Sequence, residues 1–316
     1  MVMAVYEVVF ASEAHSASGA GHIMRCIAYA AHFQRLGISV GLYGRNDFDW
    51  IQQVISNHSF SSIDDNDECE LLIIDSYNLD FVLNTRRKVT HKHLIQIADP
   101  STPLIQTSGV IWLDPYPPDR SIMDRHRILA EGFSFMPPRF SSRSNIQAAQ
   151  EEQVLVTLGG SPNKKHIESL LRVTNDPIFA DVTFNCFFSK PPDVSVVDNH
   201  IFLGVGSQLD LMVDTCSTVI SGAGTSVWDF LVAGKLVGVL KLVENQENNY
   251  RFITSKNFAL ALGDMSEKNE MDSDSLFTLL VDKEKRSQLR QHISSQIDNR
   301  GAVRLAEILL GELKRP

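Results

Sequence analysis

Short runs of β-branched and other apolar residues alternate along the chain with longer segments in which apolar residues recur at helical spacing. This alternation is typical of βαβ units, in which helices cover both faces of a parallel sheet. A helix is expected at residues 23–36, with Gly37 as its C-terminal cap. Buried strands of the first half are expected at residues 5–10, 38–43, 71–74 and 94–98.

The pattern breaks between Met136 and Gln153, where two prolines precede a polar stretch rich in Ser, Gln and Glu. An amphipathic pattern at residues 300–313 predicts a helix packed on one of the domains. A second series of strands is expected at residues 154–158, 182–188, 200–203, 218–221 and 236–240. The sequence therefore predicts an α/β protein of two domains, residues 1–145 and 146–316, and leaves open a return of the last helix to the first domain.

Charge and composition exclude several classes of protein. The 316 residues include 29 Lys and Arg against 38 Asp and Glu, a net charge of -9 that repels a phosphate backbone and argues against non-specific nucleic-acid binding. The four cysteines lie far apart without zinc-ligand spacing, so reduced thiols are expected. No metal site and no cofactor are expected either. No apolar run reaches the ~20 residues of a membrane span and no secretion signal is evident, so a cytoplasmic location is expected.

A glycine-containing loop leads from the first expected strand into the first helix. Gly19 and Gly21 precede His22 and Arg25. Because glycines let backbone amides approach an anion closely, this loop is a candidate phosphate site. It does not complete the dinucleotide fingerprint GxGxxG, since residues 22–25 read His-Ile-Met-Arg and supply no third glycine. NAD binding therefore has little support.

His22 and Asp75 are the candidate catalytic residues of the first domain. A neutral imidazole at the start of a helix can act as a general base near neutral pH, although it can also simply cap the helix or bond to the loop. Asp75 directly follows the strand expected at residues 71–74. It can orient His22 or bind a sugar hydroxyl, or instead serve as the N-cap of the following helix.

The second domain offers two further loops in which glycines follow a strand and can present backbone amides to an anion. Their candidate binding residues are Gly159, Gly160, Gly222, Gly224, Thr225 and Ser226. Asp229, one turn into the following helix, can accept hydrogen bonds from ribose hydroxyls. The alternative is a tight structural turn with Ser226 as the helix cap. Asn245 and Gln246 supply amides after another strand, in a segment that by itself is typical of a solvated loop.

Five stretches, taken together, resemble one family; they are residues 19–26, 71–77, 132–135, 158–160 and 220–248. The family is the UDP-2,4-diacetamido-2,4,6-trideoxy-altropyranose hydrolase of the pseudaminic acid pathway, with its spore-coat polysaccharide relatives. The similarity runs in order from about residue 5 to about residue 260. It implies a metal-independent enzyme with the GT-B fold, in which two Rossmann-like domains with parallel sheets face each other across a cleft.

The resemblance also implies roles for individual residues. His22 would activate water for displacement of UDP at the anomeric carbon, with Asp75 as the second catalytic residue. The second domain would bind the nucleotide diphosphate. The implied substrate-binding residues are Gly19, Gly21, Arg25, Tyr77, Gly159, Gly160, Gly222, Gly224, Thr225, Ser226, Asp229, Asn245 and Gln246.

The chain departs from the family at three places. Residues 11–13 read Ala-Ser-Glu where the family has Arg-x-Asp, Pro100 replaces the second of two aspartates, and Asp229 replaces a glutamate. The predicted function is hydrolysis of a nucleotide-activated amino or deoxy sugar in bacterial surface-glycan biosynthesis, with other glycan-biosynthesis enzymes as candidate partners. Two alternatives remain: a glycosyltransferase that uses a UDP-sugar donor, and a non-catalytic nucleotide-sugar-binding protein, which the lost arginine and altered acid suggest.

Overall fold

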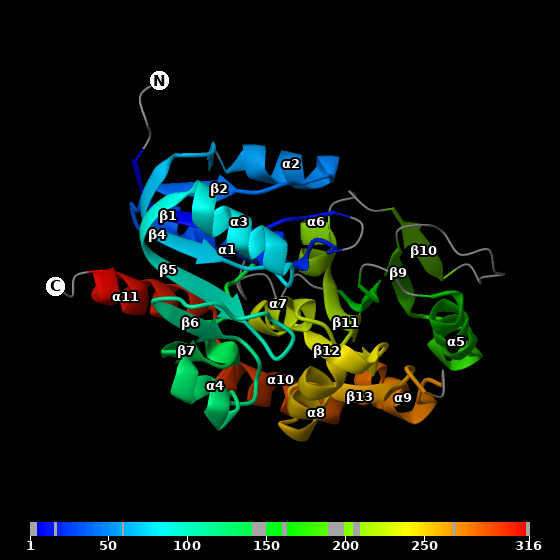
Figure 1. Ribbon diagram of the computed structural model, residues 1–316. Helices are drawn as coiled ribbons and strands as arrows, with labels where there is room; N and C mark the ends of the chain where they lie inside the picture. Colours follow the sequence, from blue (N-terminus) through cyan, green and yellow to red (C-terminus); the bar gives the residue numbers. More distant parts are fainter. Residues whose placement is uncertain are drawn as a thin grey trace. The chain divides into compact units, whose positions relative to one another are not determined.

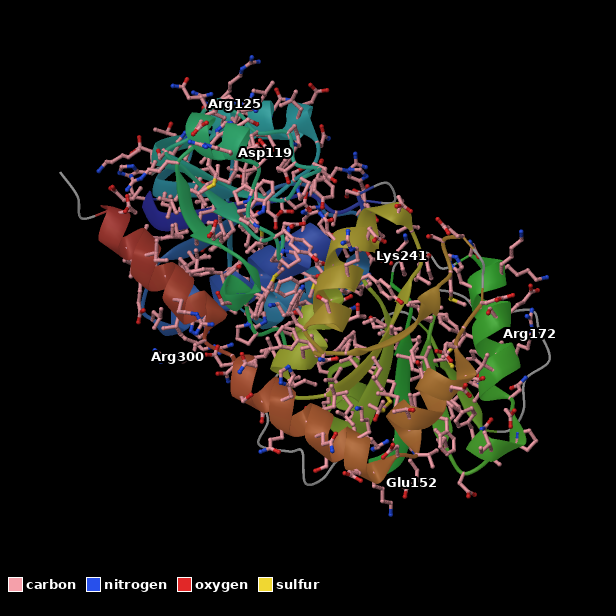
Figure 2. The ribbon with its side chains drawn as sticks, turned by 90° about the horizontal axis from the view of Figure 1, so that it is seen from below. Asp119, Arg125, Glu152, Arg172, Lys241 and Arg300 are labelled. Carbon is pink, nitrogen blue, oxygen red and sulfur yellow. The ribbon has the colours of Figure 1, made fainter. Side chains whose placement is uncertain are left out.

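The computed structural model describes residues 5–15, 18–58, 60–140, 150–159, 163–188, 199–204, 209–267 and 270–313. The chain divides into two compact units. One unit combines Met1–Arg139 with Arg300–Pro316, and the other is Phe140–Asn299. The first unit is therefore built from two separate pieces of sequence, and Arg300, labelled in Figure 2, marks the point where the chain returns to it.

A seven-stranded sheet forms the centre of the first unit, and all its paired strands are parallel (Figure 1). The strand order is β3-β2-β1-β4-β5-β6-β7, so the winding direction reverses between β1 and β4. Ligands of such sheets bind at this switch point, beyond the carboxyl ends of the strands. The strands are β1 (Val5–Ala11), β2 (Val40–Tyr43), β3 (Ser61–Ser62), β4 (Glu68–Ile74), β5 (Thr90–Ala98), β6 (Gly109–Trp112) and β7 (Ile128–Glu131).

Helices cover this sheet and bury their apolar sides against it. The helical elements are α1 (Gly21–Arg35), α2 (Asp49–Asn57), α3 (Leu79–Lys88), α4 (Arg120–Arg125), η1 (Phe133–Phe135) and α11 (Gly301–Leu313). On α1, Tyr29 stacks on Phe10 of β1 and Phe33 meets the same ring edge-on, with all three side chains buried. Asp119 caps α4, whose last turn holds Arg125 (Figure 2).

The last helix, α11, packs on α1, β7 and η1. Arg304 of α11 donates to the Ser134 carbonyl oxygen through Nε at 3.0 Å and Nη2 at 2.5 Å. The Tyr29 hydroxyl of α1 donates to the Phe135 carbonyl oxygen at 2.6 Å. The backbone of η1 therefore joins the two helices.

A six-stranded parallel sheet forms the centre of the second unit, in the order β10-β9-β8-β11-β12-β13. The strands are β8 (Gln150–Thr157), β9 (Thr183–Phe187), β10 (His200–Leu203), β11 (Cys216–Gly222), β12 (Leu236–Lys241) and β13 (Leu260–Asp264). The winding reverses between β8 and β11, which places a second switch point there.

The helical elements around this second sheet are α5 (Lys164–Thr174), η3 (Pro177–Phe179), α6 (Leu209–Thr215), α7 (Ser226–Val232), η4 (Glu244–Gln246), α8 (Glu247–Ser255), α9 (Ser273–Leu280) and α10 (Lys283–Gln296). Helix α9 lies close to β12, because a Cβ built at Gly238 would meet Leu279 at 2.6 Å. Two parallel α/β sheets were expected from the sequence, and the structure confirms them.

Candidate functional site

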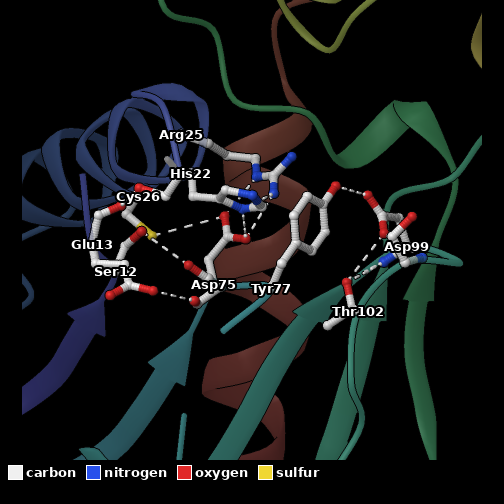
Figure 3. A network of polar contacts seen from close by, with 12 residues as sticks. Ser12, Glu13, His22, Arg25, Cys26, Asp75, Tyr77, Asp99 and Thr102 are labelled. Carbon is white, nitrogen blue, oxygen red and sulfur yellow. Dashed lines mark hydrogen bonds and ion pairs between the residues drawn. The ribbon is translucent and has the colours of Figure 1, made fainter. Parts of the chain in front are cut away.

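The candidate site of the first unit lies at the switch point between β1 and β4. His22 occupies the first turn of α1, and Arg25 lies three residues later on the same side of the helix. Asp75 directly follows the last residue of β4. Figure 3 shows both α1 side chains pointing toward the Asp75 carboxylate. The fold thus joins groups that are 50 or more residues apart in the sequence.

His22 and Arg25 make three short contacts with the two oxygens of the Asp75 carboxylate. His22 Nδ1 lies 2.7 Å from Oδ1 of Asp75. Arg25 donates from Nη2 to the same oxygen at 2.7 Å and from Nε to Oδ2 at 2.7 Å. The Asp75 side chain is 1% exposed, against 12% for His22 and 11% for Arg25. The carboxylate is therefore buried, and hydrogen bonds to charged groups replace its hydration.

Opposing effects set the charge state of this pair. Burial alone would raise the pKa of Asp75, but the positive charge of Arg25, the electrostatic interaction with His22 and the hydrogen bonds from both side chains lower it to about 2. Burial opposes the charged form of Arg25 as well, yet the Asp75 carboxylate raises the pKa of the guanidinium above its ordinary value. Near neutral pH, Asp75 is consequently an anion and Arg25 a cation.

This geometry fixes the tautomer of His22. An ionised carboxylate only accepts hydrogen bonds, so Nδ1 of His22 carries the proton that points to Asp75. Arg25 Nη2 lies 3.2 Å from the same nitrogen, but both atoms are then donors, and this contact is not a hydrogen bond. In the neutral ring the lone pair lies on Nε2, which has no hydrogen-bond partner among the described residues. Nε2 is thus available as a base.

An aromatic side chain packs beside the imidazole. The Tyr77 ring meets the His22 ring edge-on, with centroids 4.3 Å apart and planes at 85°. The Tyr77 hydroxyl donates to Asp99, which follows β5 and also accepts from Thr102 (Figure 3). Partial burial and the Asp99 carboxylate raise the pKa of Tyr77 above its ordinary value. Tyr77 is 46% exposed, so much of its ring is open to a ligand.

The loop after β1 supports this network from the other side. Ser12 Oγ donates to the Asp75 carbonyl oxygen at 2.9 Å. Ser76 Oγ donates to Glu13 Oε1 at 3.1 Å, and the buried Glu13 also lies 3.6 Å from Nε2 of His15. Glu13, which stands where the resembling family has an aspartate, thus contributes to the support of the loop that carries Asp75.

Two alternatives from the sequence are wrong. Asp75 does not cap the following helix: Asn78 is the N-cap of α3, and its side chain accepts from the backbone N–H groups of Asp80 and Phe81. His22 does not cap α1 either, because Ala20 holds the N-cap position without a side-chain bond. Gly19 has a positive φ of 70°, which a residue with a side chain adopts at a cost, and Gly21 is the first residue of α1.

In the second unit, the predicted glycine residues lie at the carboxyl ends of β8 and β11, beside the switch point. Gly159 follows β8 with a positive φ of 85°, and Gly160 lies outside the described residues. Gly222 ends β11, where an added Cβ would approach Leu242 Cδ1 to 2.9 Å. Gly224 and Thr225 then lead into α7, whose first residue is Ser226. Ser226 is not the N-cap, which is Thr225 without a side-chain bond, so the capping alternative is wrong.

Asn249 of α8 braces this glycine turn. Its Nδ2 donates to the carbonyl oxygens of Ala223 at 2.9 Å and Gly224 at 3.0 Å, while its Oδ1 accepts from Nε1 of Trp228 at 2.9 Å. All hydrogen-bonding groups of one amide therefore shape the turn. Asn249 was not among the binding residues predicted from the sequence, although it ends the same run of amides as Asn245 and Gln246.

The remaining candidates of the second unit lie around that turn. Gln246 Oε1 accepts from the Leu242 backbone N–H at 2.9 Å, so this side chain already shapes the end of β12. Asn245 is exposed, and Asp229 is half-buried in the first turn of α7. The expectation of a solvated loop at residues 244–249 is wrong, because η4 and the first turn of α8 form there. Propensity misses such short helical turns when neighbouring strands and helices hold them.

Three acidic side chains in the second unit surround a lysine. Lys241, at the end of β12, is 4% exposed and lies 2.8 Å from Glu247, 2.9 Å from Asp264 and 3.3 Å from Glu244 (Figure 2). Hydrogen bonds to these carboxylates raise the pKa of Lys241 above its ordinary value. Throughout the described part of the chain, no three His, Cys, Asp or Glu side chains gather in a way that could hold a metal ion.

No helix in the described ranges is long and apolar enough to cross a bilayer. The chain matches no protein-family model and no curated protein.

Solved structures, in contrast, match nearly the whole chain. The spinosyn forosaminyltransferase SpnP has 13% sequence identity and a TM-score of 0.63, with 97% of this chain and 99% of that one covered. The glycosyltransferase VinC, in complex with dTDP, has 9% identity and a TM-score of 0.62 over 96% and 98% of the two chains. The glycosyltransferase SnogD from Streptomyces nogalater has 15% identity and a TM-score of 0.54 over 96% and 100%.

The chain has the GT-B fold. At these low identities the similarity defines the fold alone. Both groups of candidate residues lie at the carboxyl edge of a parallel sheet, at the switch point of each unit, which is where ligands of such sheets generally bind. The structure brings His22, Arg25, Asp75 and Tyr77 into one network in the first unit, and gathers Gly222, Gly224, Thr225, Ser226 and Gln246 around one turn in the second.

Proposed function

We propose that this GT-B protein hydrolyses a nucleotide-activated amino or deoxy sugar and releases UDP, as a member of the family that the sequence resembles. The observation that carries the proposal is the His22 imidazole, whose Nδ1 proton is directed to a buried, ionised Asp75 and whose Nε2 remains available. An oriented imidazole with a free nitrogen is the arrangement that general-base activation of water requires.

In the proposed reaction, Nε2 of His22 takes a proton from a water molecule while the water oxygen bonds to the anomeric carbon. The bond between that carbon and the diphosphate oxygen breaks, and UDP leaves with the electron pair. Asp75 stabilises the imidazolium that forms. In the second unit, the glycine turn that contains Gly222 and Gly224 supplies backbone amides for the diphosphate, with Thr225 and Ser226 as hydroxyl donors and Asp229 for the ribose.

A glycosyltransferase is the second candidate, because SpnP and VinC are named as transferases and VinC was crystallised with dTDP. In this case His22 would take its proton from an acceptor hydroxyl, and the rest of the site would act unchanged. The two reactions differ only in the nucleophile that Nε2 activates. We place the protein in bacterial surface-glycan biosynthesis and in the cytoplasm, where nucleotide sugars are made.

The purified protein should be incubated with a panel of UDP- and dTDP-sugars, and nucleotide release followed with and without acceptor alcohols. Hydrolysis predicts release in water alone, whereas transfer predicts release only when an acceptor is added. Nucleotide binding without release of either kind would contradict both reactions. Because UDP is assigned to the second unit, isothermal titration with UDP tests that assignment separately.

His22→Asn tests the role of the imidazole. Loss of a general base typically lowers kcat by about 10²–10⁴-fold, while affinity for UDP should stay nearly constant. His126→Asn, at the end of α4, is the matched control and should keep full activity. Full activity in His22→Asn would show that His22 is not the base.

A further inference from the structure

We propose that Arg25 is a positioning residue that neutralises Asp75, so that Asp75 orients His22 without holding it as an imidazolium. The proposal rests on the proposed role of His22 as a general base. It also gives Arg25 a different role from substrate binding, which the family resemblance implies for this residue.

Burial leaves little of the Arg25 guanidinium open to a substrate. Two of its N–H groups, on Nε and Nη2, bind the two oxygens of Asp75, each at 2.7 Å. The side chain is 11% exposed and its partner 1%, so the pair forms a largely buried, two-bonded ion pair. Such planar pairing fixes the orientation of the carboxylate as well as its charge.

Neutralisation follows from the distances around Nδ1 of His22. Oδ1 of Asp75 lies 2.7 Å from this nitrogen and Nη2 of Arg25 lies 3.2 Å from it. A carboxylate alone at this distance favours the protonated imidazole, which cannot act as a base. The cation at a comparable distance opposes that effect, because the two charges interact with the ring with opposite signs. The hydrogen bond to Asp75, which sets the ring orientation and tautomer, is unaffected.

Other titratable groups around His22 do not supply this positive charge. Burial raises the pKa of the Cys26 thiol well above its ordinary value, so it is neutral, and the Tyr77 hydroxyl is neutral for a related reason. Asp99 and Glu13 are carboxylates that bind Tyr77 and Ser76 rather than His22. Within the described network of His22 and Asp75, Arg25 is thus the sole cation that faces the ring.

Three variants test the proposal by NMR on the full chain labelled with ¹⁵N-histidine, with His22→Asn used to assign the signals. Arg25→Gln removes the positive charge. We expect His22 to keep its proton on Nδ1 while its titration midpoint rises by about one pH unit or more. Asp75→Asn leaves the Arg25 charge unopposed and should move the midpoint in the opposite direction. Arg35→Gln removes the same charge from the exposed last turn of α1 and should leave the midpoint unchanged.

Kinetics separate positioning from substrate binding. In Arg25→Gln the acidic limb of the kcat profile should move to higher pH together with the NMR midpoint, while KM changes less than about threefold. Arg25→Lys keeps the positive charge but cannot form the two-bonded pair with Asp75. It should leave the acidic limb of the kcat profile at its original pH. A KM increase of about tenfold with an unmoved limb would show that Arg25 binds substrate.

An unchanged titration midpoint in Arg25→Gln would overturn the proposal, as would absence of the Nδ1-protonated tautomer of His22 in the unmodified protein. Arg25→Met removes the same positive charge, so its titration decides the question if Arg25→Gln does not fold. The NMR titration needs no substrate, so it tests the role of Arg25 independently of activity. If the unmodified protein releases no UDP from any nucleotide sugar, that result contradicts the proposed function and not the role of Arg25.

Discussion

Gly301 lies against the backbone of Met136, so closely that a Cβ built on it would stand 2.0 Å from the Met136 carbonyl oxygen. Gly301 is the first residue of α11, and this contact lets the helix start directly beside the segment that follows η1. Since the obstacle is a backbone atom, a side-chain rotation cannot relieve it.

We expect Gly301→Ala to lower the free energy of unfolding by about 1–3 kcal/mol, the range typical of overpacked sites. Gly311→Ala on the same helix is the control, because a Cβ at Gly311 meets nothing within 4 Å. That variant should raise stability by up to about 1 kcal/mol through helix propensity. Urea denaturation of both variants measures the difference. Equal effects of the two substitutions would show that the backbone relaxes around Gly301.

Asn249→Asp should weaken UDP binding by about tenfold or more. The carboxylate keeps the acceptor for Trp228 Nε1 but loses the two N–H donors, and it places negative charge against the carbonyl oxygens of Ala223 and Gly224. The glycine turn should then lose the shape that presents its amides. Isothermal titration with UDP measures the affinity.

Asn248→Asp is the matched control, since it adds the same charge at an exposed position one residue earlier. It should change the affinity much less. Equal losses in the two variants would indicate a general effect of charge on the anionic ligand rather than a role of Asn249 in shaping the turn.

Asp75 should make stability depend on pH in the acid range. Its pKa in the folded protein is about 2, below the ordinary value of 3.8, so the unfolded chain binds a proton more readily. Its contribution, on the order of 2 kcal/mol, is therefore complete above about pH 4 and disappears as the pH falls toward 2.

Urea midpoints between pH 2 and pH 5 check this sign. The stability difference between the unmodified protein and Asp75→Asn should shrink steadily as the pH falls. Asp124→Asn, on the exposed surface of α4, should show no comparable change. A difference for Asp75→Asn that stays constant down to pH 2 would contradict the depressed pKa.

The sequence predicted those elements whose apolar pattern is long enough to be distinctive. The strands at β1, β4 and β8 and the helices α1 and α11 appear near their expected positions. Strands β3, β6, β7 and β13, of two to five residues, were not predicted, although β2 and β10, of four residues each, were. In such short segments, pairing with a neighbouring strand decides the structure and period-2 alternation cannot be recognised.

The candidate site shows the same limit. Motif spacing singled out His22 and suggested Asp75 as its partner, because both follow strands that end at the same edge of a sheet. Motif spacing could not reveal that Arg25 donates two hydrogen bonds to Asp75, since that ion pair spans 50 residues of sequence. The hydrogen bonds from Asn249 to the glycine turn could not be predicted either, because the sequence of a run of amides does not show which side chain points toward the turn.

The assignment of α11 to the first unit has a consequence for biosynthesis. The segment Phe140–Asn299 is contiguous and can complete its own sheet as soon as it leaves the ribosome. The N-terminal part of the first unit leaves the ribosome before α11 is made, because α11 is translated after the entire second unit. Until then, the surfaces of α1 and β7 that α11 covers stay exposed. The nascent protein thus matures in the reverse of its order of synthesis, and the apolar surface awaiting α11 is where chaperone engagement or misassembly would concentrate.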